Sequence, residues 1–154
     1  MRLVLKLIAP AIFYLGYFLF RSPFARRSKA VHNFTMKVFR VAADNGSTRA
    51  LSLYGNLLFY KGDGQQNRIQ GGIYLERAAT AGDSKAQYQM GRVYESGFEN
   101  YFMPSPTKAL AFYRLAAEQG HGLAISRLAT IYQHGELSQP VDTAQYLYWQ
   151  GQKA

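Results

Sequence analysis

An internal repeat is the feature that most constrains what this chain of 154 residues can fold into. Three segments share an Ala-Ala pair that is followed three residues later by glycine. These glycines are Gly46, Gly82 and Gly120, and they lie 36 and 38 residues apart. A second landmark, an alanine that opens an apolar pattern, recurs with the same spacing. These alanines are Ala50, Ala86 and Ala124. Two landmarks with one period indicate a true repeat, and periods of this length are typical of stacked supersecondary units.

Each unit has the pattern of a helical hairpin. In its first half, apolar and small residues fall at i, i+4, i+5 and i+8, which is one face of a helix. The small residue at i+5 is Gly55, Gly91 or Ala129. Because glycine inside a helix costs up to about 1 kcal/mol relative to alanine, its use there predicts close approach of a neighbouring helix. The first helices are expected to end at the glycines Gly62, Gly97 and Gly135. The second helices carry a tyrosine and the Ala-Ala pair: Tyr74, Ala78 and Ala79, then Tyr113, Ala116 and Ala117.

This pattern resembles the Sel-one-like repeat, a relative of the tetratricopeptide repeat. The resemblance covers about residues 38–154, and residues 83–120 match best. The first full unit departs from the family at Tyr54, Leu58 and Gly71, and the last helix has Gly151-Gln152 in place of the Ala-Ala pair. The resemblance implies an all-α fold, a short right-handed α-solenoid of antiparallel helical hairpins. It also implies an adaptor role, often in envelope assembly, secretion or surface-polysaccharide systems.

The N-terminal segment predicts a membrane helix. Residues 3–20 read LVLKLIAPAIFYLGYFLF and carry one charge, at Lys6. Eighteen helical residues reach roughly 27 Å, close to the hydrocarbon thickness of a bilayer. An uncleaved transmembrane anchor is the leading interpretation, with a cleaved signal peptide and a buried or surface helix as alternatives. Residues 21–27 lack the small-residue pattern of a cleavage site.

Positive charge is concentrated beside this segment. Residues 1–43 hold eight Lys and Arg and no Asp or Glu, whereas residues 44–154 hold ten cations and nine anions. The flank that follows the apolar run is the more basic one, which predicts that the C-terminal part stays cytoplasmic at a bacterial inner membrane. A periplasmic C-terminal part is the alternative. The nearly neutral remainder lacks the basic face that a nucleic-acid binder needs.

The expected layout has three parts. A transmembrane anchor covers residues 1–22, and a basic linker with a helix over about 29–44 covers residues 23–46. That helix behaves like the second helix of a truncated opening repeat. The repeats follow as units 47–82, 83–120 and 121–154.

Nothing in the sequence predicts an enzyme. The absence of cysteine excludes thiolate zinc sites, iron–sulfur clusters and cysteine nucleophiles. None of the three histidines has a carboxylate or a second histidine at i+3 or i+4, and residues 61–64 lack the pattern of a phosphate or calcium loop. Glu95 and Glu99 are interpreted as solvated. We therefore expect no catalytic residue, cofactor, metal or small-molecule substrate.

The partner-binding surface is predicted on the first helices, whose residues line the concave face of tetratricopeptide-like solenoids. Carried over position by position, the candidates are Arg49, Ser52, Asn56 and Phe59, then Lys85, Tyr88, Arg92 and Glu95, then Ser126, Thr130 and Gln133. Tyr101 and Phe102 in the aromatic turn 98–104 are added because exposed apolar side chains often mark contacts. The expected function is a membrane-anchored adaptor that binds a protein partner. A periplasm-facing scaffold and a small accessory subunit held through its membrane helix are the alternatives.

Overall fold

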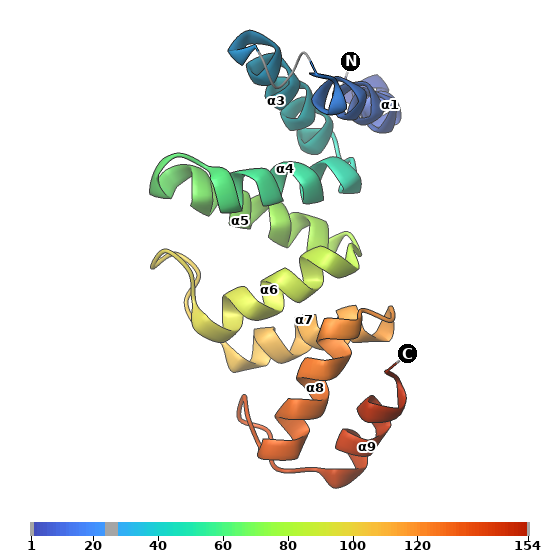
Figure 1. Cartoon of the computed structure of the whole chain (residues 1–154), viewed down its shortest axis with the longest axis vertical. Helices are drawn as coiled ribbons and strands as arrows, with labels where there is room; N and C mark the ends of the chain where they lie inside the picture. Colours follow the sequence, from blue (N-terminus) through green and yellow to red (C-terminus); the bar gives the residue numbers. More distant parts are fainter. Residues whose placement is uncertain (1, 24–27, 154) are drawn as a thin grey trace. The chain divides into compact units, whose positions relative to one another are not determined.

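The computed structural model describes residues 2–23 and 28–153, and within them eight helices form with no β-strand. The chain divides into two units, Met1–Ala81 and Gly82–Ala154. The first unit holds α1 (Arg2–Arg21), α3 (Lys29–Asp44), α4 (Thr48–Lys61) and α5 (Gly64–Thr80). The second holds α6 (Ser84–Ser96), α7 (Pro106–Glu118), α8 (Gly122–His134) and α9 (Thr143–Gly151), as labelled in Figure 1. The all-α class and the hairpin pattern are therefore confirmed.

The repeats begin at side-chain caps. Ser47, Asp83 and His121 stand at equivalent positions just before α4, α6 and α8. Each side chain accepts a hydrogen bond from the backbone N–H three residues later. The distances from that nitrogen to the accepting atom are 3.3, 2.7 and 3.4 Å. These bonds satisfy one of the free N–H groups at each helix start. The three repeat-ending glycines have φ of +91°, +100° and +81°, a left-handed conformation that glycine adopts without strain.

In the first unit, α1 is the packing partner of α3. Ala9, Phe13 and Gly16 are the buried residues of α1, and they recur at helical spacing on one side of it. Phe39 of α3 is fully buried, and its ring centroid lies 5.9 Å from that of Phe13 and 5.8 Å from that of Phe20. The apolar N-terminal helix thus forms a hairpin with α3.

The hairpin of α4 and α5 depends on two glycines. A Cβ at Gly71 would lie 2.3 Å from the backbone nitrogen of Phe59, and one at Gly55 would lie 3.0 Å from that of Leu75. The two backbones therefore touch, and the departure from the family pattern at Gly71 has a steric reason. The expected end of α4 at Gly62 is confirmed: Gly62 caps the helix with an ordinary φ of −67°, and the positive φ of that turn falls at Gly64.

The second unit packs α7 against both α6 and α8, and α9 against α8. Its largest fully buried side chains are Met90, Tyr113, Leu128 and Ile131. A Cβ at Gly91 would lie 2.6 Å from the ring of Tyr113, so this glycine makes room for an aromatic side chain. Trp149 is buried and holds the short α9 in place.

Candidate interaction surface

The first-unit candidates lie along α4. Arg49 is exposed, and its guanidinium carbon lies 5.5 Å from the ring centroid of Tyr14 on α1. Asn56 donates its side-chain N–H to the backbone oxygen of Ser52 at 2.9 Å, and both residues are half-buried. Phe59 is also half-buried, with its ring 5.0 Å from that of Tyr60. This surface therefore offers three kinds of group: a cation that lies over an aromatic ring, a side-chain amide, and a half-buried aromatic ring.

The α6 candidates form a stripe of two cations around an aromatic ring. Lys85, Tyr88 and Arg92 follow one another at i, i+3 and i+7, which places them on one side of the helix. Both cations are exposed, whereas Tyr88 is half-buried. The ring of Tyr88 stacks on that of His121, with 4.8 Å between centroids and 21° between planes. The stacking thus orients Tyr88 between two exposed charged side chains.

Glu95, at the end of α6, is part of a network that spans three helices. Arg127 of α8 donates from Nε to Glu95 Oε2 at 3.2 Å and from Nη2 to Oε1 at 2.5 Å. Tyr113 of α7 donates its hydroxyl to Oε2 at 2.5 Å, and Arg127 also pairs with Glu136. This corrects the sequence-based interpretation of Glu95 as a solvated carboxylate, because its oxygens are already used within the unit.

The network shifts the protonation of its members. Burial by itself would raise the pKa of the Glu95 carboxyl, but the hydrogen bonds from Arg127 and Tyr113 outweigh it and lower that pKa below its usual value. Burial and the bond to Glu95 raise the pKa of the Tyr113 hydroxyl far above the ordinary value for tyrosine. Glu95 therefore stays ionised and Tyr113 neutral at physiological pH, which suits a structural clamp.

The α8 candidates are polar and uncharged, and a local hydrogen bond links two of them. Ser126, Thr130 and Gln133 follow one another at i, i+4 and i+7 on one side of the helix. The Thr130 hydroxyl donates to the backbone oxygen of Ser126 at 3.1 Å, and Gln133 is exposed. This stripe offers hydrogen-bonding groups and no charge.

The aromatic turn between α6 and α7 separates the two residues that were predicted there. Tyr101 is 55% exposed, whereas Phe102 is 4% exposed and packs edge-on against Tyr94. Backbone bonds between Phe98 and Phe102 close the turn and direct the second ring inward. Phe102 is therefore removed from the candidate surface, because its side chain is buried. Met103, which sequence reasoning did not select, is 67% exposed beside it.

Sequence reasoning also missed Arg127 and Tyr14. Arg127 follows the candidate Ser126 and belongs to a different side of α8, where its partner Glu95 lies 32 residues earlier in the chain. Tyr14 lies in the apolar run, yet its ring contacts the predicted residue Arg49. Helical spacing marks residues that share a face and carries no signal for such distant pairs.

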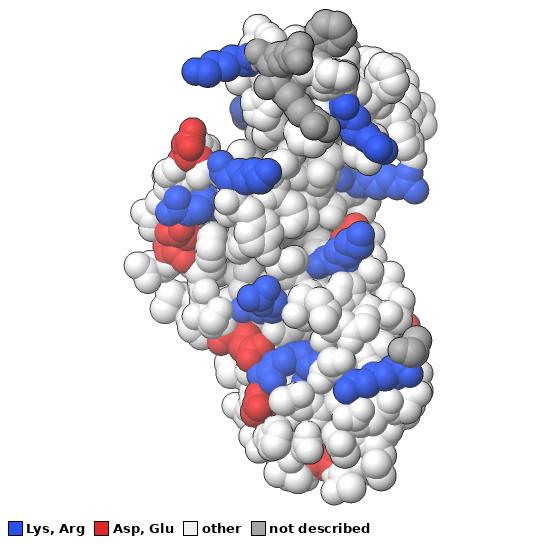
Figure 2. All heavy atoms as spheres, in the orientation of Figure 1, with Lys and Arg blue, Asp and Glu red and all other residues white. Residues whose placement is uncertain are grey.

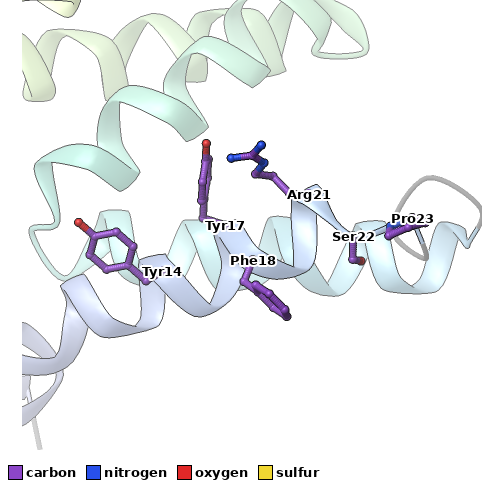
Figure 3. A pocket seen from close by; sticks show the side chains of 6 residues that line it. All are labelled: Tyr14, Tyr17, Phe18, Arg21, Ser22 and Pro23. Atoms are coloured by element: carbon purple, nitrogen blue, oxygen red, sulfur yellow. The ribbon is translucent and has the colours of Figure 1, made fainter.

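An open hollow of about 630 Å³ lies against the C-terminal half of α1. Tyr14, Tyr17, Phe18 and Arg21 line it, together with Ser22 and Pro23. Figure 3 shows Tyr14, Tyr17 and Arg21 on one side of the helix and Phe18 on the other. The guanidinium carbon of Arg21 lies 5.8 Å from the ring centroid of Tyr17. The hollow thus combines aromatic surface with one positive charge.

On one face of the described chain, charge is dispersed. On the face drawn in Figure 2, Lys and Arg groups are separated by uncharged surface and by acidic groups. Among the described residues, no three His, Asp or Glu side chains gather as potential metal ligands. The candidate surfaces are therefore suited to contacts with other molecules through individual side chains.

The family model of the Sel1 repeat matches residues 9–35, 48–83, 84–121 and 122–149. The chain belongs to the Sel1 repeat family. Repeats of this family generally mediate protein–protein interaction, and their fold is not typically enzymatic. The first match begins within α1 and ends within α3, so the Sel1 pattern reaches further toward the N-terminus than the resemblance at residues 38–154 indicated.

Solved structures show the same fold. A Sel1 repeat protein from Oxalobacter formigenes has a TM-score of 0.73 and 23% identity, covering 93% of this chain and 56% of that one. A protective antigen of uropathogenic Escherichia coli with a Sel-one-like repeat fold has a TM-score of 0.74 and 24% identity, covering 94% of this chain and 30% of that one. An immunity protein from Pseudomonas aeruginosa has a TM-score of 0.55 and 24% identity, covering 75% of this chain and 42% of that one. This Sel1 chain thus spans between 30% and 56% of the length of these proteins. No curated protein sequence matches it significantly.

Proposed function

We propose that this chain is an adaptor that binds a protein partner through the first helices of its Sel1 repeats and is held at the inner face of a bacterial inner membrane by its N-terminal apolar segment. The observation that carries the partner-binding part is the α6 stripe. Lys85 and Arg92 are exposed, and Tyr88 between them stacks on His121. An ordered aromatic ring flanked by cations loses little conformational entropy on binding, and Tyr and Arg dominate protein interfaces.

The chemistry of this stripe favours an acidic or extended partner segment. Lys85 and Arg92 donate hydrogen bonds to carboxylates or main-chain carbonyls, and Tyr88 supplies apolar area. Arg49 and Phe59 play the same parts in the first unit. Ser52 and Asn56 add polar groups in the first unit. In the second unit Ser126, Thr130 and Gln133 do the same, and Tyr101 adds exposed aromatic area in the turn.

The membrane part of the proposal is supported by α1. The 19-residue stretch Leu3–Arg21 contains an 18-residue window with a mean hydropathy of 2.0, of which 17% is buried within the protein. A helix of this length and composition is suited to contact with a membrane, and its buried stripe adds a packing role. The basic flank after α1 supports a cytoplasmic position for the repeats.

Site-specific photocrosslinking tests the partner-binding part. A photoreactive residue replaces Tyr88 in the full chain, and a control replaces Leu115, which is exposed on α7. We expect one cross-linked partner from position 88, and we expect a combined Lys85→Ala and Arg92→Ala change to reduce it roughly tenfold or more. The matched control Lys153→Ala, which removes an exposed cation elsewhere in the same unit, should leave it unchanged. Equal cross-linking from Leu115, or survival of the product in the double variant, would contradict the proposal.

The exposed aromatic hollow on α1 favours one second candidate, an accessory subunit held to a membrane complex through this helix. In that case substitution of Tyr14 or Tyr17 abolishes assembly, whereas Arg92→Ala does not. The adaptor predicts the reverse.

Reporter fusions determine on which side of the membrane the repeats lie. A fluorescent protein active in the cytoplasm and, separately, a phosphatase active in the periplasm are fused after Ala154. Periplasmic activity would replace the cytoplasmic adaptor by an envelope scaffold.

A further inference from the structure

The outward face of α1 is an uninterrupted apolar strip. At 100° per residue, its exposed apolar residues cluster opposite the buried stripe of Ala9, Phe13 and Gly16. They are Leu3, Val4, Leu7, Ile8, Leu15 and Phe18, with exposures between 43% and 76%. A run of exposed apolar side chains of this kind is unusual on a surface that faces only water. One side of α1 is therefore used for packing on α3, and the other is left without cover in the described chain.

α3 also exposes apolar side chains within this hairpin. Phe34, Val38 and Val41 follow at i, i+4 and i+7, so they share one stripe. Val38 lies against Gly16 of α1, where an added Cβ would come within 2.9 Å of it. Phe34 and Val41 on either side are 56% and 43% exposed. The exposed apolar area thus belongs to the α1–α3 hairpin as a whole.

A docked α1 cannot cross a bilayer. α3 lies alongside it and exposes Asn33, Lys37 and Arg40. A bilayer-spanning α1 would carry these groups into the hydrocarbon, where each charged side chain costs at least about 2.5 kcal/mol. Separation of the helices would instead uncover Phe39, which is fully buried and packs against Phe13 and Phe20 of α1. A position in the plane of the membrane surface avoids both costs.

The charges of the hairpin match an anionic surface. Residues 1–43 contain no Asp or Glu. Lys6, Arg21, Lys29 and Lys37 are exposed cations of α1 and α3. On α1, Lys6 and Arg21 fall on the same flank as Tyr17, beside the apolar strip. An apolar face edged by Lys, Arg and Tyr is the composition of helices that lie at the boundary between headgroups and acyl chains.

We propose that α1, still packed on α3, lies in the plane of an anionic bilayer surface, with Leu7, Leu15 and Phe18 in the acyl boundary and the flanking cations among the headgroups. This inference rests on the proposed membrane attachment and specifies its form. Figure 3 shows the arrangement at the end of α1, where Phe18 projects to one side and Tyr17 and Arg21 to the other. The hollow between them lies at the depth where phosphate groups meet the helix.

Cysteine labelling tests the in-plane position, and the native chain contains no cysteine. Arg2→Cys and Asn33→Cys are placed singly in the full chain, one at each side of a hypothetical span. Membrane-impermeant maleimide is applied to spheroplasts and to inverted membrane vesicles. We expect both positions to be protected in spheroplasts and labelled in inverted vesicles. Labelling of the two positions from opposite sides would overturn the inference and would leave the membrane-held adaptor intact. Loss of the chain from the membrane fraction would overturn both the inference and the proposed attachment.

Vesicle flotation tests the chemistry of the surface. The purified full chain is mixed with vesicles of phosphatidylcholine, alone or with phosphatidylglycerol. We expect at least about tenfold more binding to the anionic vesicles, decreasing with salt. The double change Leu7→Gln and Phe18→Gln should abolish this binding. The matched control Leu147→Gln, at an equally exposed leucine of α9, should not. Equal binding to neutral and anionic vesicles would overturn the inference. So would a double variant that floats normally. A third outcome also overturns the inference: the native chain does not bind vesicles, and the double variant loses a cross-link to a protein. This face would then be a protein docking surface instead.

Discussion

Arg127 of α8 holds both carboxylate oxygens of Glu95 on α6, with Nε 3.2 Å from Oε2 and Nη2 2.5 Å from Oε1. Tyr113 of α7 donates to the same carboxylate, so three consecutive helices of the second unit meet at one side chain. The side chains of Arg127 and Glu95 are 23% and 28% exposed, which limits solvent screening of their attraction. The pair therefore works as a clamp on the helix order of this unit.

Removing the clamp should destabilise the second unit. We expect Arg127→Ala to lower the free energy of unfolding by about 1–2 kcal/mol, because hydrogen bonds to charged groups contribute more than neutral ones and partial exposure reduces the effect. Urea denaturation measures it. Arg92→Ala, which removes an exposed cation on α6, is the control and should stay within about 0.5 kcal/mol. A loss that is equal in both variants would show that the clamp adds nothing.

Acid should weaken the same clamp. The pKa of the Glu95 carboxyl is lowered in the folded chain, so its stabilisation is present above the unfolded value near 4.5 and is lost as the pH falls through the folded value. We expect the stability of the native chain to fall as the pH drops below about 4.5, and Glu95→Gln to lack part of that fall. Thermal denaturation of both proteins across this range is the measurement. Identical pH profiles would exclude Glu95 as a contributor.

His121 should make stability depend on pH near neutrality. Its Nδ1 accepts the Ala124 N–H, which requires an unprotonated nitrogen. Burial and the nearby charge of Lys85 lower the pKa of the imidazole below 6.5. The stabilisation is therefore complete above 6.5 and is lost as the pH falls through the folded value.

The neighbouring repeat supplies a matched test of this cap. Asp83 occupies the equivalent position, so His121→Asp keeps a capping oxygen and removes the imidazole. We expect the pH-dependent part of the stability just below pH 6.5 to disappear, as followed by thermal melts at several pH values. His121→Ala should lose about 1 kcal/mol at neutral pH because the cap is absent. An unchanged pH profile in the aspartate variant would refute this role.

The contact between α4 and α5 should not accept a methyl group. We expect Gly71→Ala to cost about 1–3 kcal/mol, because the new Cβ would meet the backbone of Phe59 and one of the helices must shift. Chemical denaturation measures the loss. Gly151→Ala on α9 meets open space and is the control, where alanine should be neutral or slightly stabilising. A neutral Gly71→Ala would mean that the two helices separate easily.

The two sides of α1 should respond differently to truncation. Phe13 is 7% exposed against α3, whereas Phe18 is 75% exposed. We expect Phe13→Ala to cost about 3 kcal/mol or more and Phe18→Ala to cost little. Limited proteolysis and urea denaturation of the full chain in detergent micelles measure the difference. Equal effects would indicate that α1 is not packed on α3.

Local patterns in the sequence predicted most of the fold. The expected helix over residues 29–44 coincides with α3, and the three hairpins lie within the expected units. Terminal glycines such as Gly82 act over a few residues, so their role can be predicted without knowing which distant residues they pack against. The same holds for the small residues Gly55 and Gly91, whose spacing alone predicted close packing.

The candidate site was predicted less completely, because side-chain use depends on distant partners. Lys85 and Arg92 are exposed, as expected of residues on a first helix. Glu95 shares their helix but is occupied by Arg127, which lies 32 residues away. Phe102 is adjacent to the exposed Tyr101 but is buried by the closure of its turn. Helical spacing says which residues share a face and does not say what meets that face.

By itself the sequence determined the repeat period, the helical hairpins and the positive charge of the N-terminal arm, since each depends on residues close together in the chain. Only the tertiary structure decided how α1 is used. An apolar helix has the same composition whether it meets lipid or protein. The packing of Phe13 against Phe39 shows that one side of it belongs to the repeat core. The ionic clamp and the burial of Phe102 were decided at the same level, because folding brings together groups whose separation along the chain carries no local signal.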